Sequence, residues 1–380
     1  MSRVVAVEPV LPGDGYAQGA ITEAVGPLVA PDPARAALLR RLHASAGVRR
    51  RHLVLPLDQY AGLHSLGATN AVFVREGAVL AEQASRRALA AAGLEPADVD
   101  HVFATSVTGV AAPSLDVLLA ERLGLRSGVR RTPSFGLGCA GGAGGLARVH
   151  DHLRGRPGDV SLLVSVELCS LTLQHGDDST ANMVASGLFG DGAAAVVVVG
   201  ADHPLAQDGA ADGAAVGSGS AATAAPAAGR QRRTARVVDT RSRLYPGTTA
   251  ALGWEVRDTG FAIVLSAGLP DLLRAHLLAD VKDLLAEHDV TPSEVPTWVV
   301  HAGGPRVIDA VRDALGLSED AVRESRASLA DAGNLSSASV LDVLARTLAR
   351  SEAPPGSLAV LMAFGPGVSC ELVLLRLEGR

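Results

Sequence analysis

The chain has 380 residues, of which 48% are hydrophobic and 19% charged, and its formal net charge is -6 at pH 7. This composition predicts a compact globular protein and excludes the dense basic face that a nucleic-acid-binding protein needs. With three cysteines, no evident signal peptide and no apolar run long enough to span a bilayer, we expect a soluble cytoplasmic protein without a disulfide framework or membrane span.

The first half of the chain alternates helical and strand patterns. Helices are predicted over 33–46, 70–92 and 114–125, and buried strands over 101–107, 162–168 and 192–199. Strands that alternate with helices predict an α/β protein with layers built on a parallel or mixed sheet.

An Ala/Gly/Ser-rich stretch over 205–235 has no hydrophobic period, so it cannot pack a core and is expected to be a surface insertion. It divides an N-terminal half (1–204) from a C-terminal half (236–380). The second half repeats the pattern, with helices predicted over 271–288, 305–317 and 335–349 and strands over 297–304, 357–365 and 369–379. The similar order of elements suggests two pseudo-symmetric halves.

The segment SFGLGCAGGAGGLARVHDHL (134–153) contains Gly136, Gly138 and Gly141 in the G-x-G-x-x-G spacing of a dinucleotide-binding loop. Glu167, 26 positions after Gly141 (167 minus 141), ends the next strand, where such a site carries the acidic residue that binds the ribose. The fingerprint normally opens a domain, however, whereas this one follows an earlier strand and helix. An NAD-dependent oxidoreductase is therefore an alternative hypothesis, which tight NAD binding without thioester chemistry would support.

Cys139 lies within the same segment, where a strand should give way to a helix. A thiol in the first turn of a helix meets the positive end of the macrodipole, which favours the thiolate, and free backbone N–H groups that can hold an oxyanion. Cysteine is also a common small buried residue. This stretch alone leaves a nucleophile and a core residue equally open.

Three further motifs favour the nucleophile. His301 ends a predicted strand and is followed by a Gly-Gly-Pro turn, and strand ends are where α/β proteins build sites. Asn334 stands between a glycine and a predicted helix, where it could also be an N-cap. The FGPG turn that begins at Phe364 joins two apolar strands. Together, in this order, the four features predict an active site.

These motifs resemble those of the type III polyketide synthases, the chalcone synthase-like members of the thiolase superfamily, in their bacterial form. The matching pieces, spread over about 33–377, are GCAGG around Cys139, GLFGDGAAAVVV from Gly187, HAGGP at His301, GNLSSASV from Gly333 and FGPG from Phe364. The resemblance implies the five-layered αβαβα thiolase fold and a homodimer. HxGGP and FGPG distinguish it from the ketoacyl synthase III branch.

The resemblance also implies the chemistry of an acyltransferase. Cys139 would take an acyl group from a CoA thioester, and His301 would keep the thiol ionised as its imidazolium partner. His301 and Asn334 would stabilise the enolate that forms when malonyl-CoA loses CO2, and the enolate would attack the acyl-Cys139 in a Claisen condensation. The cycle would repeat before the product cyclises to a pyrone or resorcinol. No metal or redox cofactor is implied, only acyl-CoA and malonyl-CoA as substrates.

The resemblance also implies, position by position, which residues gate and line the product cavity. Phe189 and Phe261 match the two phenylalanines that gate it, and its lining would comprise Val107, Ala112, Cys169, Thr172, Ser336, Phe364, Gly365, Pro366 and Gly367. Val107 and Cys169 replace threonines of plant chalcone synthases, and Ala112 replaces a methionine that reaches the partner subunit's cavity. This less polar, roomier lining favours a medium- or long-chain fatty acyl starter.

The CoA-binding cations match the family only in part. Arg41 matches one position, whereas Leu38 and Ser45 stand where plant members carry lysines. Arg40, the arginine run over 49–51 or Arg306 would take over this role.

Three alternatives remain from the sequence. Within the family, the enzyme could be a malonyl-CoA-primed synthase of the tetrahydroxynaphthalene type. Outside it, the chain could be a ketoacyl synthase III-like condensing enzyme that uses an acyl carrier protein. A catalytically silent thiolase-fold partner is disfavoured because Cys139, His301 and Asn334 are all present.

Overall fold

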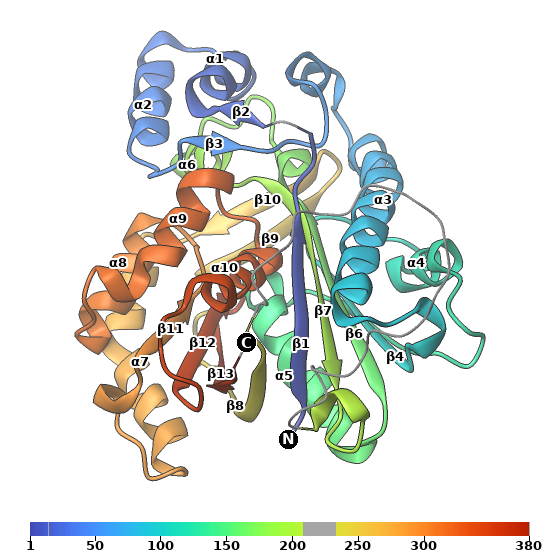
Figure 1. Cartoon of the computed structure of the whole chain (residues 1–380). Helices are drawn as coiled ribbons and strands as arrows, with labels where there is room; N and C mark the ends of the chain where they lie inside the picture. The colour runs from blue at the N-terminus through green and yellow to red at the C-terminus, as the bar shows by residue number, and fades with distance from the viewer. Residues whose placement is uncertain (14, 208–232, 380) are drawn as a thin grey trace.

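The computed structural model describes residues 1–13, 15–207 and 233–379 (Figure 1). The Ala/Gly-rich insertion predicted over 205–235 lies almost wholly outside the described residues. A 3-10 turn over Pro204–Ala206 precedes the gap, and a strand begins at Ala235 after it.

One mixed sheet runs through both parts of the chain. The N-terminal part contributes β1 (Arg3–Val10), β4 (His101–Ser106), β5 (Arg130–Phe135), β6 (Val160–Leu168) and β7 (Asp191–Val199). The C-terminal part contributes β8 (Ala235–Leu244), β11 (Thr297–Val300), β12 (Leu358–Gly365) and β13 (Ser369–Leu377). Their order is β11-β12-β13-β8-β1-β7-β6-β4-β5, and the two groups meet where β1 pairs with β8. β4 is parallel to β5 and β6, and β11 to β12, whereas the other neighbours are antiparallel.

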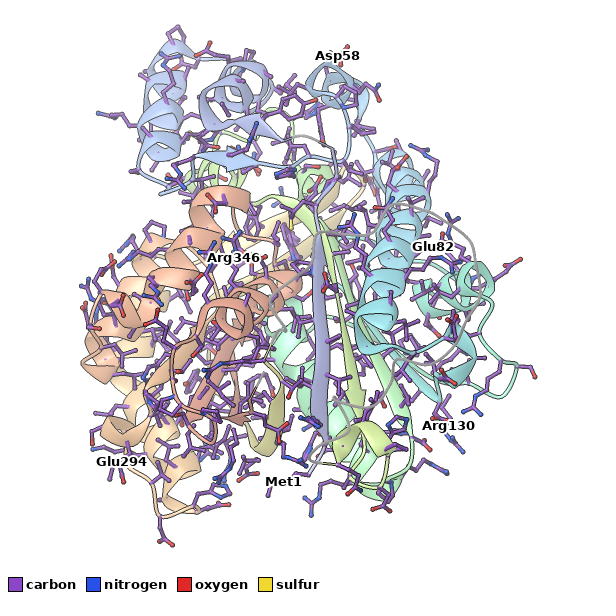
Figure 2. The ribbon with its side chains drawn as sticks, in the orientation of Figure 1. Met1, Asp58, Glu82, Arg130, Glu294 and Arg346 are labelled. Atoms are coloured by element: carbon purple, nitrogen blue, oxygen red, sulfur yellow. The ribbon has the colours of Figure 1, made fainter. Side chains whose placement is uncertain are left out.

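Helices cover this sheet in three places (Figure 1). On the outer side of the N-terminal strands lie α3 (Leu66–Ala92) and α4 (Leu115–Leu123), and on the outer side of the C-terminal strands lie α7 (Leu269–Ala286) and α8 (Pro305–Leu315). Between the two groups of strands, α5 (Gly141–Gly155) packs against α10 (Ser337–Arg350). Charged side chains such as Glu82 and Arg130 project outward from the outer layers (Figure 2). The layers therefore alternate α, β, α, β, α, as the resemblance implied.

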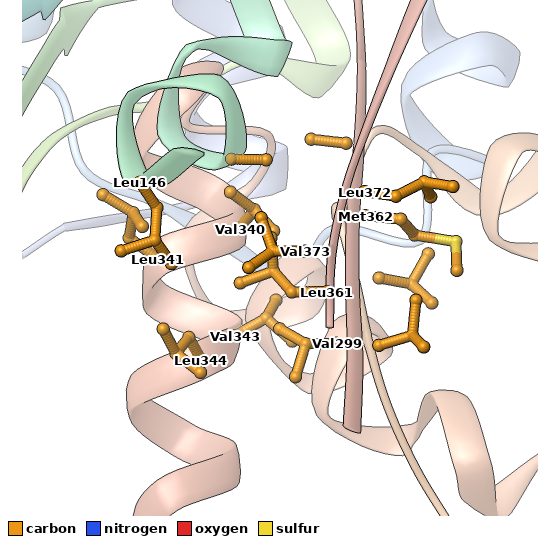
Figure 3. Packing of buried hydrophobic residues seen from close by; sticks show 14 of the residues in the cluster. Leu146, Val299, Val340, Leu341, Val343, Leu344, Leu361, Met362, Leu372 and Val373 are labelled. Carbon is orange, nitrogen blue, oxygen red and sulfur yellow. The ribbon is translucent and has the colours of Figure 1, made fainter. Parts of the chain in front are cut away.

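α10 lies at the centre of the larger hydrophobic core (Figure 3). Leu341 lies beside Leu146 of α5, whereas Val340 and Val343 lie toward Leu361 and the neighbouring strands. All five side chains are fully buried. This packing fixes where α5 and α10 begin relative to each other, and the candidate site lies at those two starts.

Glycines in α5 allow this close approach. A Cβ on Gly142 would lie 2.3 Å from the carbonyl oxygen of Ser337, and a Cβ on Gly145 would lie 2.7 Å from Leu163 Cδ1. A side chain at Gly142 would collide with backbone, and one at Gly145 would displace Leu163, so these two glycines serve helix packing.

The remaining helices and strands lie outside the nine-stranded sheet. They are β2 (Tyr16–Ala17), α1 (Gln18–Val29), α2 (Pro33–Ala44), β3 (Arg50–Arg51), α6 (Thr180–Leu188), β9 (Leu252–Arg257), β10 (Gly260–Leu265) and α9 (Arg323–Ala332). β9 and β10 form an antiparallel hairpin, and β2 pairs with β3.

Every helix and strand predicted from periodicity is present, with ends shifted by a few residues. The patterns do not predict β1, β8, the β9–β10 hairpin or the helices α1, α6 and α9. β1 is a single apolar run near a proline and a glycine, and its central place depends on pairing with β7, far along the chain. No helix among the described residues is long and apolar enough to cross a membrane.

Candidate active site

Cys139 lies in a 3-10 turn, η3 (Gly138–Ala140), that runs directly into α5. The FGPG turn packs against this loop. Gly138 has a φ of 51°, and a Cβ there would lie 2.4 Å from Pro366 Cδ, while a Cβ on Gly365 would lie 2.4 Å from the carbonyl oxygen of Leu137. The turn therefore supports the backbone that presents Cys139.

The Cys139 thiol is half-buried and contacts one hydroxyl. Its Sγ donates to Ser336 Oγ at 3.7 Å. Burial raises the pKa of the Cys139 thiol to about 12, and the hydrogen bond with Ser336 opposes this rise. The negative charge of Glu167 raises the pKa further, whereas Asn334 lowers it. Burial therefore favours the protonated form of the thiol.

His301 follows the last residue of β11 and is 2% exposed. Its backbone N–H donates to the carbonyl oxygen of Met362, and its Nδ1 has no hydrogen-bond partner among the described residues. Burial lowers the pKa of the imidazole to about 3. Burial therefore favours the neutral form of each group taken separately, and the thiolate–imidazolium pair implied by the resemblance stays a prediction.

Both the oxygen and the nitrogen of the Asn334 side-chain amide form hydrogen bonds. Its Oδ1 accepts from Ser336 N at 2.8 Å and Ser339 Oγ at 3.2 Å, and its Nδ2 donates to the carbonyl oxygen of Gly303 at 3.3 Å. With Oδ1 occupied, Nδ2 is the end that can donate to a substrate. The N-cap of α10 is Ser336, so Asn334 is not the N-cap that the sequence left open.

Gly303 lies against the His301 ring and forms a hydrogen bond with Asn334. A Cβ on Gly303 would lie 3.0 Å from Cδ2 and 3.1 Å from Nε2 of His301, while its carbonyl oxygen accepts from Asn334. Asn334 in turn lies close enough to lower the pKa of Cys139. The structure therefore brings the three predicted catalytic residues to one place, at the start of the two central helices.

Glu167 is a member of this site that the sequence assigned to a different role. It is fully buried at the end of β6, where its Oε1 accepts from Ser336 Oγ at 3.2 Å and also from Ser337. Its Oε2 accepts from Val107 N at 3.1 Å and Thr108 Oγ1 at 2.9 Å. Burial raises the pKa of its carboxyl group. A carboxylate with these partners cannot reach a ribose, and it orients the hydroxyl that contacts Cys139.

Phe189 lies beside Asn334. Asn334 N donates to Leu188 O at 2.8 Å, and Gly190 N donates to Asn334 O at 3.0 Å. The Phe189 ring lies 6.2 Å from that of Trp254 on the hairpin. The other predicted gate residue, Phe261, is 4% exposed, and its ring lies 6.1 Å from that of Phe135.

A small pocket lies behind Phe189. Its cavity volume is about 30 Å³, and its walls include Cys169, Thr172, Phe189, Trp254 and Ile263. Two predicted cavity residues, Cys169 and Thr172, therefore meet here. Val107, by contrast, is 2% exposed and is tied to Glu167 through its backbone.

Ala112 lies in a separate hollow. This hollow has a volume of about 480 Å³ and is lined by Asn70, Val74, Val110 and Leu118 together with Ala112 and its neighbours. Val110 is 43% exposed. Within one chain, then, Ala112 faces the surface and not the pocket behind Phe189.

The candidate CoA-binding arginines divide into two groups. Arg40 and Arg41 are exposed on α2, and Arg306 is exposed at the start of α8. A Cβ on Gly47, three residues after α2, would lie 3.9 Å from Pro305, the first residue of α8, so these two helix ends lie side by side. Arg51 is different: it is 3% exposed. Its Nε donates to Gln18 Oε1 at 2.9 Å and its Nη1 to Phe189 O at 2.8 Å. Its inclusion in a surface run of cations was wrong, because β3 turns the side chain inward.

Two family models match the chain, the N-terminal domain of chalcone and stilbene synthases over residues 33–203 and their C-terminal domain over residues 236–378. The chain is 50% identical over 375 residues to a 1,3,6,8-tetrahydroxynaphthalene synthase of Streptomyces peucetius subsp. caesius, which covers 99% of this chain and 93% of that protein. It is 33% identical over 337 residues to a protein of the same name from Streptomyces coelicolor, covering 89% of this chain and 82% of the relative. The crystal structure of a tetrahydroxynaphthalene synthase from S. coelicolor A3(2), a bacterial type III polyketide synthase, has a TM-score of 0.86 at 29% identity and covers 99% of both chains.

The chain therefore belongs to the chalcone and stilbene synthase family and is a type III polyketide synthase, which is an acyltransferase. The family resemblance, the fold and the enzyme class expected from the sequence are confirmed. The oxidoreductase hypothesis is wrong, since the chain belongs to this family and Glu167 is enclosed.

Proposed function

We propose that the enzyme is a malonyl-CoA-primed synthase that makes 1,3,6,8-tetrahydroxynaphthalene. The observation that carries the proposal is 50% identity over 99% of this chain to a synthase of that name. The malonyl-primed alternative is therefore favoured over the fatty acyl starter that the lining residues suggested.

In the proposed reaction the neutral imidazole of His301 takes the proton of the Cys139 thiol as the thiol attacks the carbonyl carbon of a CoA thioester. A neutral imidazole can accept this proton, whereas an imidazolium could not. The thioester forms at Sγ and CoA leaves with its sulfur protonated.

The extender step uses the amide that the structure holds in place. When malonyl-CoA loses CO2, negative charge develops on its thioester oxygen, and Asn334 Nδ2 and His301 donate to that oxygen. The fixed Oδ1 of Asn334 supports this role, because the amide cannot turn its acceptor end toward the enolate. The enolate carbon then attacks the acyl-Cys139 thioester.

CoA binding is proposed for the exposed arginines at the adjoining ends of α2 and α8. Arg40, Arg41 and Arg306 are exposed and form no ion pair within the described residues, and Pro305, next to Arg306, lies beside Gly47. Guanidinium groups bind phosphate through paired hydrogen bonds. They would hold the phosphates of CoA while its thioester reaches Cys139.

A homodimer is proposed through the edge of the sheet at β5. This strand ends the sheet order and is largely exposed, and its Phe135 is 53% exposed. An exposed edge strand with an exposed aromatic ring is a surface that proteins normally cover. Val110, which is 43% exposed beside Ala112, extends the same apolar surface.

The test is product analysis by mass spectrometry. The purified enzyme is incubated with malonyl-CoA alone, and separately with malonyl-CoA and medium- or long-chain acyl-CoA starters. Tetrahydroxynaphthalene should form from malonyl-CoA alone. No product without an added starter would overturn malonyl priming, and a strict requirement for an acyl carrier protein would favour the ketoacyl synthase III-like alternative.

A further inference from the structure

One wall of the pocket behind Phe189 is polar and buried. It is formed by Arg51, Tyr60 and Ser170, and the opposite wall is formed by Phe189, Trp254 and Ile263. Tyr60 is 2% exposed and Arg51 is 3% exposed. Burying polar groups costs free energy unless they are hydrogen-bonded, and in this wall only one Arg51 nitrogen is without a partner among the described residues. The reaction steps proposed above use none of these three residues.

Arg51 brings an unpaired donor to this wall. Its Nε and Nη1 donate to Gln18 and to the Phe189 carbonyl oxygen, but its Nη2 has no hydrogen-bond partner among the described residues. Neither acceptor is charged. Arg51 therefore lines this pocket and carries a buried N–H without a hydrogen-bond partner among the described residues, and the pocket adjoins Asn334 through Phe189.

Two hydrogen bonds join Tyr60 to Ser170 and Ser170 to Asp191, and both run from donor to acceptor in that order. Ser170 Oγ donates to Asp191 Oδ2 at 2.5 Å, which uses its one proton. The contact between Tyr60 Oη and Ser170 Oγ, at 2.7 Å, must then have Tyr60 as the donor. Leu55 N donates to Tyr60 Oη at 3.3 Å, so the phenol oxygen keeps one free lone pair. The chain thus runs from a pocket residue to a buried carboxylate.

Asp191 is placed to receive a proton at the end of this chain. It is fully buried at the start of β7, and its other partners are Val54 N and Ser170 N, each at 2.7 Å. Burial raises the pKa of the Asp191 carboxyl group to about 6, and the positive charge of Arg51 opposes this rise. The carboxylate can therefore exchange a proton near neutral pH.

We propose that this wall is a subsite for the oxygen atoms of the bound polyketide and that Tyr60, Ser170 and Asp191 relay the proton that ring closure removes. A methylene between two carbonyl groups gives its proton to Tyr60 Oη as the Tyr60 proton moves to Ser170 and the Ser170 proton to Asp191. The substrate becomes an enolate, Asp191 becomes neutral, and both hydroxyls stay neutral.

Arg51 Nη2 donates to the enolate oxygen while the enolate carbon attacks a carbonyl carbon of the same chain. When the new carbon–carbon bond has formed, the oxygen that has gained the negative charge takes the proton back from Asp191 through the same hydroxyls. No oxidant or further reactant is needed. The proposal rests on the proposed function in that it acts on the polyketide made at Cys139.

The test removes one oxygen of the relay at a time and measures whether the polyketide ends as a carbocycle, a lactone or an open-chain acid. Tyr60→Phe and Ser170→Ala each remove one oxygen, and Tyr16→Phe is the matched control outside the chain. For each variant, the fraction of consumed malonyl-CoA that appears in carbocyclic product, against lactone and open-chain acid, is measured by mass spectrometry. We expect this fraction to fall by about tenfold or more in both relay variants and to stay unchanged in the control.

Two further measurements separate a relay from a structural role. The double variant should match the single ones, because one break already stops the transfer. In D2O the carbocyclic fraction of the wild-type enzyme should fall, whereas that of Tyr60→Phe should not. An unchanged fraction in either single variant, additive losses, or a fall that only tracks lower thermal stability would overturn the proposal.

These outcomes are distinguishable from failure of the proposed function. If the wild-type enzyme needs an acyl-CoA starter other than malonyl-CoA, malonyl priming is wrong. The ratio of carbocyclic to lactone product from that starter then tests the relay in the same variants.

Discussion

Cys139 Sγ lies 3.7 Å from Ser336 Oγ, although 197 positions of sequence separate the two residues. The contact joins the start of α5 to the start of α10, and Ser336 passes it on by donating to the buried Glu167. Residues from both the N-terminal and the C-terminal part of the chain, Glu167 and Ser336, therefore influence the protonation state of Cys139.

Replacing the nucleophile should separate the two halves of the reaction. Cys139→Gln cannot form a thioester, but Asn334 and His301 remain to stabilise the enolate, so the variant should still release CO2 from malonyl-CoA. Cys139→Ala should abolish condensation as well. Radiolabelled CO2 release and product analysis measure the two activities, and loss of CO2 release in Cys139→Gln would count against the roles given to Asn334 and His301.

The Ser336 and Glu167 side chains should move the pKa of Cys139 in opposite directions. The Glu167 charge raises this pKa and the Ser336 hydrogen bond lowers it. Glu167→Gln should therefore lower the pH midpoint of Cys139 alkylation by iodoacetamide, by about one unit. Ser336→Gly, which also suits the φ of 49° at this position, should raise it. Equal midpoints in both variants would contradict the network described here.

The approach of α5 to α10 predicts a large loss of stability at one glycine. Gly142→Ala places a Cβ 2.3 Å from a backbone oxygen, so the helices must separate, at a cost of about 2 kcal/mol or more in the free energy of unfolding. Gly155→Ala in the same helix meets nothing within 4 Å and should change that free energy by less than about 1 kcal/mol. Urea denaturation of the two variants checks this, and equal effects would refute it.

The buried histidines should make the protein less stable in mild acid. Burial lowers the pKa of His43 and His101 to about 4 and that of His301 to about 3, whereas each titrates near 6.5 when unfolded. The unfolded chain therefore binds more protons, so this stability is complete above pH 6.5 and is lost as the pH falls toward 4. Asp191, whose pKa is raised to about 6, works in the opposite direction and offsets part of the loss.

His43→Gln isolates one of these contributions. Its stability should fall less steeply than that of the wild type between pH 6.5 and 4, by up to about 1.4 kcal/mol per pH unit. Urea denaturation at several pH values measures the slopes. Parallel slopes would mean that His43 is charged in the folded protein.

The edge strand β5 predicts a dimer interface. Phe135→Glu buries a charge in that interface and should weaken association by about 2 kcal/mol or more, which sedimentation velocity detects as a shift to monomer. Leu244→Glu, at a residue that is 71% exposed on β8, should leave association unchanged. A monomeric wild-type protein would refute the interface.

Periodicity in the sequence predicts most of the helices and strands because their apolar faces are regular. The order of four motifs was enough to find Cys139, His301, Asn334 and the FGPG turn. Glu167 and Arg51 could not be assigned from the sequence, because a strand-end carboxylate and an arginine run look the same whether they face solvent or the core. Their burial depends on elements more than a hundred residues away, such as Ser336 and Phe189.

The raised pKa of Cys139 has a consequence between catalytic cycles. Peroxide attacks thiolates far faster than thiols, and the products beyond sulfenic acid are not restored by ordinary reductants. Burial of Cys139 favours the protonated thiol, so we expect peroxide to inactivate the resting enzyme slowly.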